Sequence, residues 1–99
     1  MGVPTLVIYD ISDNSLRFRI SEICEDFGLV RIQKSAFLGE LTSFRRKELI
    51  AKLERVLKRD GGPRDNVQIF VFSKQCLLMR HVIGAVKPYE VQESQLLFI

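Results

Sequence analysis

The sequence contains few of the residues that cross-link small secreted or metal-bound domains. Its 99 residues include only two cysteines and one histidine. Cys24 and Cys76 lie far apart, and neither belongs to a Cys-x-x-Cys pair. A disulfide framework and a structural zinc site are therefore not expected. We expect a reduced, cytoplasmic chain.

Several functional classes are excluded by missing segments and motifs. No apolar run reaches the length of about 18 residues that a membrane span needs. The first residues, Met-Gly-Val-Pro-Thr, lack the basic start and the cleavage site of a secretory signal peptide. The chain also has no Walker loop, no Gly-x-Ser-x-Gly and no Gly-x-Gly-x-x-Gly. Nucleotide hydrolysis, serine-hydrolase chemistry and membrane contact are therefore without support.

The composition is that of an ordinary globular protein, with 46% hydrophobic and 27% charged residues. Such a chain fits a single domain over residues 1–99. The net charge is only +3, but residues 42–60 hold seven Lys or Arg against three acidic residues. This segment, which includes Arg46, Lys52 and Arg55, is either a nucleic-acid-binding surface or a solvated helix rich in basic residues.

Hydrophobic periodicity places the secondary structure. Helices are expected after Ser12–Asn14, where a stripe from Leu16 to Phe27 ends at Gly28, and over residues 42–60. Residues 74–80 fit one helical turn. Apolar or alternating runs predict strands at residues 5–11, 29–38, 66–73, 81–86 and 96–99.

These elements favour an α+β fold of the ferredoxin-like βαββαβ type, with both helices on one face of an antiparallel sheet and a short fifth strand at the end. Phe37, Phe70 and Phe72 then compete with neighbouring valine and isoleucine for the helix side. One set must face away, which leaves an exposed aromatic face. We therefore predict a face-to-face homodimer, whose interface contains Phe70, Phe72, Leu97 and Phe98.

Asp10 follows the apolar run Leu-Val-Ile-Tyr, although aspartate is depleted in strands. It either ends the strand and helps to cap the next helix, or serves as a metal ligand or acid–base group. One carboxylate is a poor Mg²⁺ site, because this ion prefers several oxygen ligands. In a dimer, two Asp10 side chains near the symmetry axis could share one ion.

Three arginines and two aromatic residues form a second candidate group. Each of Arg17, Arg19 and Arg31 is explained by solvent exposure when it is considered alone. Together with Tyr9 and Phe37, they resemble phosphate contacts mixed with stacking platforms, the pattern that single-stranded nucleic acid requires. Phe18, on the polar side of its helix, needs no special role.

Two stretches resemble a known family. Tyr9–Asp13, followed by Arg17 and Arg19, is similar to the first strand and helix of the small CRISPR-associated adaptation protein, which accompanies the spacer integrase and is often named an endoribonuclease. Residues 28–39 match the Arg-x-Gln-x-Ser-x-Phe-x-Gly strand of that family. Lys34 stands where many members carry an aromatic residue.

The resemblance implies a ferredoxin-like homodimer in which the two Asp10 carboxylates bind Mg²⁺ or Mn²⁺. It also implies cleavage of phosphodiester bonds in single-stranded RNA, or in some members double-stranded DNA, and it casts Tyr9, Arg17, Arg19, Arg31 and Phe37 as substrate-site residues. The alternative is a non-catalytic scaffold of the integrase complex, in which the basic helix holds duplex DNA.

Overall fold

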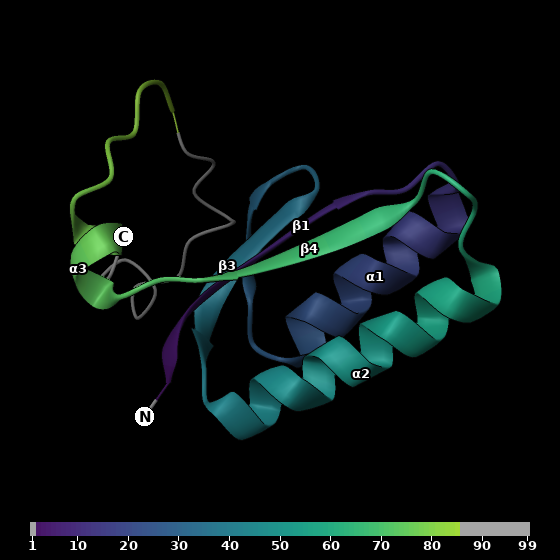
Figure 1. Cartoon of the computed structure of the whole chain (residues 1–99). Coiled ribbons are helices and arrows are strands. Elements are labelled where there is room, and N and C mark those ends of the chain that lie inside the picture. Colours follow the sequence, from purple (N-terminus) through teal and green to yellow (C-terminus); the bar gives the residue numbers. More distant parts are fainter. Residues whose placement is uncertain (1, 86–99) are drawn as a thin grey trace.

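The computed structural model describes residues 2–85 of the chain (Figure 1). A four-stranded sheet in this range has the order β2-β3-β1-β4, with every neighbouring pair antiparallel. The elements in chain order are β1 (Val3–Asp10), α1 (Asn14–Asp26), β2 (Val30–Gln33), β3 (Ala36–Leu41), α2 (Ser43–Asp60), β4 (Asn66–Val71) and α3 (Lys74–Leu78).

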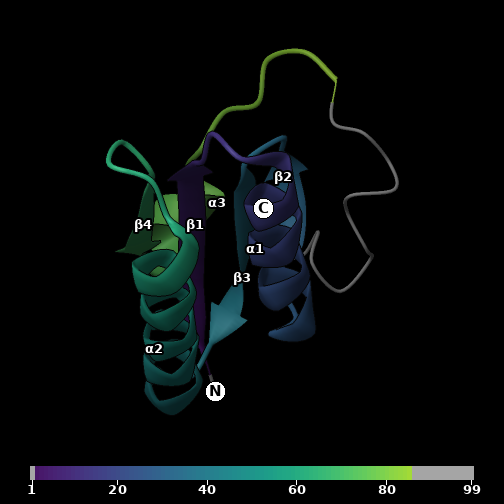
Figure 2. The same ribbon diagram turned by 90° about the vertical axis from the view of Figure 1, so that its right-hand side faces the viewer.

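Helices α1 and α2 lie side by side on one face of the sheet, and the short helix α3 lies on the other (Figures 1 and 2). This arrangement is the predicted α+β, ferredoxin-like fold. No helix within residues 2–85 combines the length and the apolar character of a membrane span.

Local signals placed the helices correctly. The Asp13 carboxylate caps α1 by accepting the Leu16 N–H at 2.8 Å, and the Thr42 hydroxyl caps α2 by accepting the Arg45 N–H at 3.2 Å. Gly28 follows the end of α1 with a φ of +85°, a conformation that only glycine adopts without strain.

The prediction of one strand over residues 29–38 is wrong. Lys34 and Ser35 form a turn, so the segment is a hairpin of β2 and β3, with a bulge between Arg31 and Gln33. The alternating pattern did not reveal the turn, because a two-residue connection need not interrupt alternation. Arg31 pairs with Phe37 across the hairpin, which places the two side chains on the same face of the sheet.

The prediction of a strand over residues 81–86 is also wrong for the described part, because residues 81–85 form no strand. Ile83 is 98% exposed and Gly84 has a φ of +100°, which is outside the extended region. An apolar run becomes a strand only when a sheet edge is available to pair with it. Val86 and the predicted fifth strand, with Leu97 and Phe98, lie outside the described residues.

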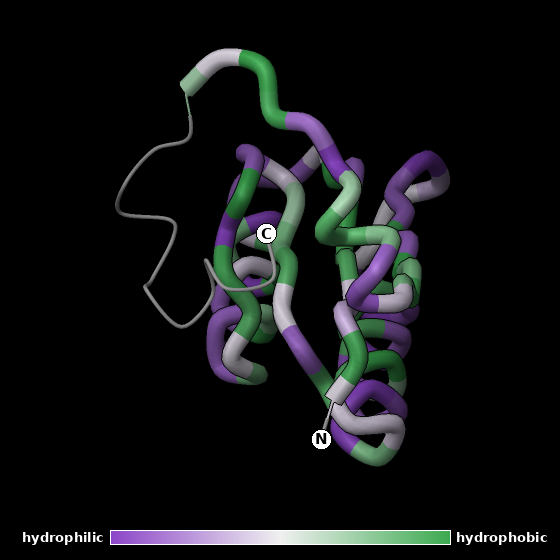
Figure 3. The backbone as a smooth tube through the Cα atoms, turned by 90° about the vertical axis from the view of Figure 1, so that its left-hand side faces the viewer, coloured by the Kyte–Doolittle hydropathy of each residue, from purple (hydrophilic) through white to green (hydrophobic). Residues whose placement is uncertain are grey.

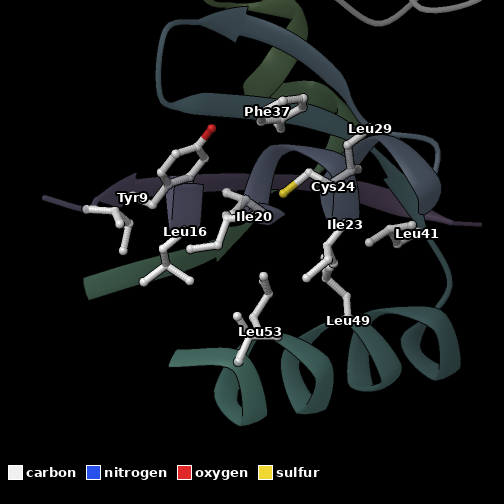
Figure 4. Close-up of a cluster of buried hydrophobic side chains, with 13 residues drawn as sticks. Tyr9, Leu16, Ile20, Ile23, Cys24, Leu29, Phe37, Leu41, Leu49 and Leu53 are labelled. Carbon is white, nitrogen blue, oxygen red and sulfur yellow. The ribbon is translucent and has the colours of Figure 1, made fainter. Parts of the chain in front are cut away.

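The main hydrophobic core fills the space between the sheet and the two long helices (Figure 4). Cys24 is a core residue, because it is fully buried in this cluster, and burial raises the pKa of its thiol to about 12. The labelled side chains of the core come from α1, α2 and the sheet: Tyr9, Leu16, Ile20, Ile23, Cys24, Leu29, Phe37, Leu41, Leu49 and Leu53.

The loops at the end of β1 and before β4 are joined by one carboxylate. Asp65 accepts the Ser12 N–H at 2.9 Å and the Gly62 N–H at 2.7 Å, and the Ser12 hydroxyl donates to it at 3.2 Å. The Gly62 and Ser12 N–H groups lower the pKa of Asp65, because they stabilise its charged form. These bonds hold the end of β1, where Asp10 lies.

The lowered pKa of Asp65 predicts a pH-dependent contribution to stability. The unfolded chain binds the proton more readily, so the contribution is complete above the ordinary carboxyl pKa and is lost as the pH falls through the lowered value. In urea unfolding, we expect Asp65→Asn to be less stable than the wild type at pH 7, and the difference to shrink toward pH 3. The control is Glu22→Gln, an exposed carboxylate on α1. A difference that does not change with pH would contradict the assignment.

Candidate nucleic-acid interface

Asp10 is the last residue of β1, pairs in register with Asn66 of β4 and is exposed. It does not cap the following helix, because Asp13 does so. The nearby Asp65 is held by the loop bonds described above. No cluster of three or more metal-ligating side chains occurs within residues 2–85. Residues 2–85 of one copy therefore do not by themselves fit a hard cation such as Mg²⁺, whereas a second copy of Asp10 would add carboxylate oxygens.

Tyr9 and Phe37 form the aromatic part of the core. Tyr9 is 5% exposed and Phe37 is 0% exposed. Their ring centroids are 6.3 Å apart with an interplanar angle of 19°. The Arg31 guanidinium carbon lies 4.9 Å from the centroid of the Phe37 ring, which is the distance of a cation–π contact.

The prediction that Phe37 is a stacking platform for bases is therefore wrong. Its ring is fully buried, because it faces the helices rather than the outside of the sheet, and no base can reach it. Its contacts with Tyr9 and Arg31 instead hold these two side chains in place.

The Tyr9 hydroxyl is buried without a hydrogen-bond partner among residues 2–85. Figure 4 shows the ring inside the cluster and its hydroxyl directed away from Leu16 and Ile20. Burial raises the pKa of Tyr9, and the positive charge of Arg31 opposes this shift in part. At neutral pH the hydroxyl therefore keeps its proton and can donate it.

Arg17 lies in the first turn of α1, shortly after the end of β1. Its Nη1 donates to the Ile11 carbonyl at 2.7 Å, and its Nη2 donates to the Asn14 side chain. Arg17 and Arg31, together with Tyr9, line a shallow cavity of about 200 Å³. The structure thus brings three of the predicted site residues together. The full lining is Tyr9, Asn14, Arg17, Phe18, Ser21, Arg31 and Lys34.

Sequence reasoning missed part of this cavity. Phe18 is 64% exposed at its edge, and Lys34 comes from the hairpin turn. Asn14, Phe18 and Ser21 share one face of α1 with Arg17, since they lie three or four residues apart. This spacing was visible in the sequence, whereas the approach of Lys34 depends on the turn between β2 and β3.

Arg19 does not join this cavity. Its Nη1 forms an ion pair with the Asp60 carboxylate at 2.7 Å, and Arg59 contacts the same carboxylate at 3.2 Å. The hydrogen bond from Arg19 lowers the pKa of Asp60. Arg19 thus joins α1 to the end of α2, and its predicted place among the substrate-site residues is not reproduced.

The predicted basic surface of α2 is divided. Lys52 and Arg55 are exposed and line an open cavity of about 480 Å³, together with Asp26 and Glu48. Arg46 instead lies on the same side of the helix as Leu49, Leu53 and Val56, and its Nη1 is buried without a partner among the described residues. Of these three predicted residues of α2, Lys52 and Arg55 are therefore the ones whose whole side chains are open to contact with nucleic acid.

The outer face of the sheet carries the expected aromatic pair. Phe70 is 41% exposed and stacks on the half-buried Phe72, with ring centroids 6.5 Å apart. Val67 and Ile69 pack on the helix side instead. Leu77 of α3 covers part of this outer face. Figure 3, viewed from the side of α3, shows that the chain beyond it turns from hydrophilic to hydrophobic before residue 85.

Comparisons with known proteins agree with this arrangement. Residues 3–80 match the sequence model of the family described as CRISPR associated protein Cas2. The CRISPR-associated endoribonuclease Cas2 of Korarchaeum cryptofilum is 46% identical over 87 residues, which cover 87% of this chain and 89% of the relative. A solved structure described as cas2 has a TM-score of 0.71 and 27% identity, and the match covers 89% of this chain and 93% of the other.

A fused relative is also informative. The CRISPR-associated endonuclease Cas1/endonuclease Cas2 fusion of Thermoproteus tenax is 35% identical over 72 residues, which cover 73% of this chain and 26% of the fusion. The family match and the identity to the Korarchaeum protein confirm the resemblance noted in the sequence. This chain belongs to the CRISPR-associated protein Cas2 family.

Proposed function

We propose that two copies of this chain form a metal-dependent endonuclease of CRISPR spacer acquisition that cuts phosphodiester bonds in single-stranded RNA. The observation that carries the proposal is the meeting of Tyr9, Arg17 and Arg31 in one cavity at the end of β1, next in sequence to the exposed Asp10. The name of the Korarchaeum relative, an endoribonuclease, supports the same activity. Double-stranded DNA is the other substrate to be tested.

In this mechanism the chain binds and orients the nucleic acid. Arg17 and Arg31 neutralise phosphate oxygens, and each is held in place by the structure, Arg17 by the Ile11 carbonyl and Arg31 by the Phe37 ring. The two Asp10 carboxylates, one from each copy, would together hold one shared Mg²⁺ or Mn²⁺. When bound, such an ion supplies Lewis-acid charge beside the scissile phosphate and makes water a better nucleophile.

The homodimer brings the two Asp10 residues together. The outer sheet face offers apolar side chains that a second copy would remove from water, among them Phe70, which is 41% exposed, and the half-buried Phe72 that stacks on it. Burying such a face against its own copy forms a two-fold interface, the commonest symmetry of soluble oligomers. The metal site and the dimer are therefore linked, because each copy supplies only one carboxylate.

A second candidate function is a scaffold that binds duplex DNA beside the spacer integrase. The fusion of Cas1 and Cas2 in Thermoproteus tenax supports an integrase partner. The exposed Lys52 and Arg55 on α2 supply a surface for phosphate contact that requires neither Asp10 nor a metal.

The nuclease proposal predicts that Asp10→Asn loses cleavage of single-stranded RNA in the presence of Mg²⁺, by about 100-fold or more, because the ion loses its ligand. Dimerisation and RNA binding are retained, since Asp10 is exposed and supports no packing. Removing the metal with EDTA has the same effect on the wild type. The matched control, Glu22→Gln, removes an exposed carboxylate from α1 and keeps full activity.

Mixing the two proteins tests whether the ion is shared. After equal amounts of wild-type and Asp10→Asn protein exchange subunits, about one quarter of the dimers carry both carboxylates, so activity falls to about one quarter of that of the pure wild type. Activity that falls only to one half would mean that each copy works alone. Asp10→Asn protein that cleaves as fast as the wild type would refute the catalytic assignment.

The dimer prediction concerns the outer sheet face. Phe70→Lys places a charge in the proposed interface, and we expect the mass measured by light scattering at micromolar concentration to fall from that of a dimer to that of a monomer. Phe44→Lys is the control, because Phe44 is 70% exposed on α2, away from this face. A wild-type protein that is already monomeric would contradict the proposal.

The scaffold function predicts a change in the salt dependence of DNA binding. The double variant Lys52→Glu and Arg55→Glu should bind duplex DNA more weakly, and its plot of log affinity against log salt should be less steep by about two. The control, Lys47→Glu and Lys58→Glu, changes the net charge equally on another exposed side of α2. Equal effects of the two pairs would show that only overall charge matters.

A further inference from the structure

The cavity at the start of α1 combines features that no other part of residues 2–85 shares. Three cationic side chains, Arg17, Arg31 and Lys34, line a space of about 200 Å³. None of the three forms an ion pair with a carboxylate of the described residues, although Arg19, Arg45, Arg59 and Lys74 all do. No acidic residue belongs to the lining. The cavity is therefore strongly positive and uncompensated.

The Tyr9 hydroxyl is a further hydrogen-bond donor at this cavity, and no described residue accepts its proton. Tyr9 belongs to the lining and is 5% exposed, and its buried hydroxyl, which lies near Arg31, has no hydrogen-bond partner among the described residues. A buried donor without a partner costs free energy, which a ligand oxygen in the cavity would recover. Because Arg17 and Arg31 lie in the same lining, a negatively charged hydrogen-bond acceptor fits this position better than an apolar group.

The arginines keep donors for such a ligand. Arg17 uses Nη1 for the Ile11 carbonyl and Nη2 for the Asn14 side chain, and Arg31 uses Nη1 for the Lys34 carbonyl. Each guanidinium has five N–H donors, so both retain unused ones. The Asp13 carboxylate, which interacts electrostatically with Arg17, is occupied as the cap of α1.

We propose that this cavity binds the terminal phosphate of a nucleic-acid strand, with the base of the terminal nucleotide stacked on Phe18. The inference rests on the proposed function, because it assumes that nucleic acid is the ligand. A terminal phosphomonoester carries a charge of about −1.5 to −2 and three acceptor oxygens, which is more than an internal phosphodiester offers. Three unpaired cations and one phenol donor match the terminal group.

Phe18 is the reason for inferring a nucleotide rather than a free phosphate as the ligand. It is 64% exposed at the edge of the cavity, one position after Arg17 on α1. An exposed aromatic ring beside phosphate-binding cations is the arrangement on which unpaired bases stack, irrespective of their sequence. Phe44 is 70% exposed on α2 but does not line this cavity, so it provides a matched comparison.

The test measures binding without cleavage. Fluorescence anisotropy in EDTA compares three single-stranded oligonucleotides of one sequence, with a 5′-phosphate, a 3′-phosphate or no terminal phosphate. The wild type should bind one of the phosphorylated strands about tenfold more tightly than the strand without a terminal phosphate, and the better strand identifies the end that enters the cavity.

Three variants locate the effect. Tyr9→Phe removes only the hydroxyl and keeps the ring that packs on Phe37, and Lys34→Ala removes one cation at the turn. Both should reduce the preference for the phosphorylated end severalfold, whereas Lys47→Ala on α2 should leave it unchanged. Phe18→Ala should weaken the binding of all three strands more than Phe44→Ala does, because stacking does not depend on the phosphate.

The outcomes separate this proposal from the nuclease proposal. Equal binding of the three strands by the wild type, or a preference that survives in both Tyr9→Phe and Lys34→Ala, would overturn the terminal-phosphate site. RNA cleavage that requires Asp10 would still stand in that case. Conversely, a preference for the phosphorylated end in a protein that cleaves no RNA would support the cavity and refute the nuclease.

Discussion

The contact between Tyr9 and Phe37 determines how the rest of the site is arranged. Tyr9 belongs to β1, Phe37 to β3, and Arg31 of β2 lies over the Phe37 ring, so one small cluster connects three neighbouring strands. Because Phe37 faces the helices, the hairpin of β2 and β3 presents Ile32 and Leu38 to the opposite face. If the hairpin were shifted by one residue, its side chains would exchange faces. Ile32 would then face the helices, and the Phe37 ring would face outward. Both the outer apolar face and the cationic cavity therefore depend on this register.

Much of the fold was predictable because its signals are local. The stripe of α1, its cap at Asp13 and its end at Gly28 require only residues that are close in sequence. The strand errors are of a different kind. Whether residues 29–38 form one strand or two, and whether residues 81–85 join the sheet, depends on pairing with distant segments. Hydrophobic pattern alone does not contain that information.

In the candidate site, too, some features follow from local sequence and others depend on contacts between distant segments. The sequence grouped Tyr9, Arg17 and Arg31, and the structure brings these three together in one cavity. It also grouped Arg19 and Phe37 with them, but ion pairing with Asp60 removes the first and burial removes the second. Residue type identifies a side chain that can bind phosphate, whereas its freedom to do so depends on its neighbours. Lys34 illustrates the converse, because only the hairpin turn brings it to the cavity.

The alternation of β1 also constrains the chemistry. Successive residues of a strand point to opposite faces, so Tyr9 faces the helix side while Asp10, still paired with Asn66, faces the other. A phosphate group bound at the Tyr9 hydroxyl therefore lies on the other face of β1 from the Asp10 side chain. If the strand end is held in the cavity, the bond that is cut must belong to a nucleotide farther along the strand, after it has passed the end of β1. Binding and cleavage would then be separated by a short, fixed length of nucleic acid, and the loop bonds of Asp65 would keep that separation constant.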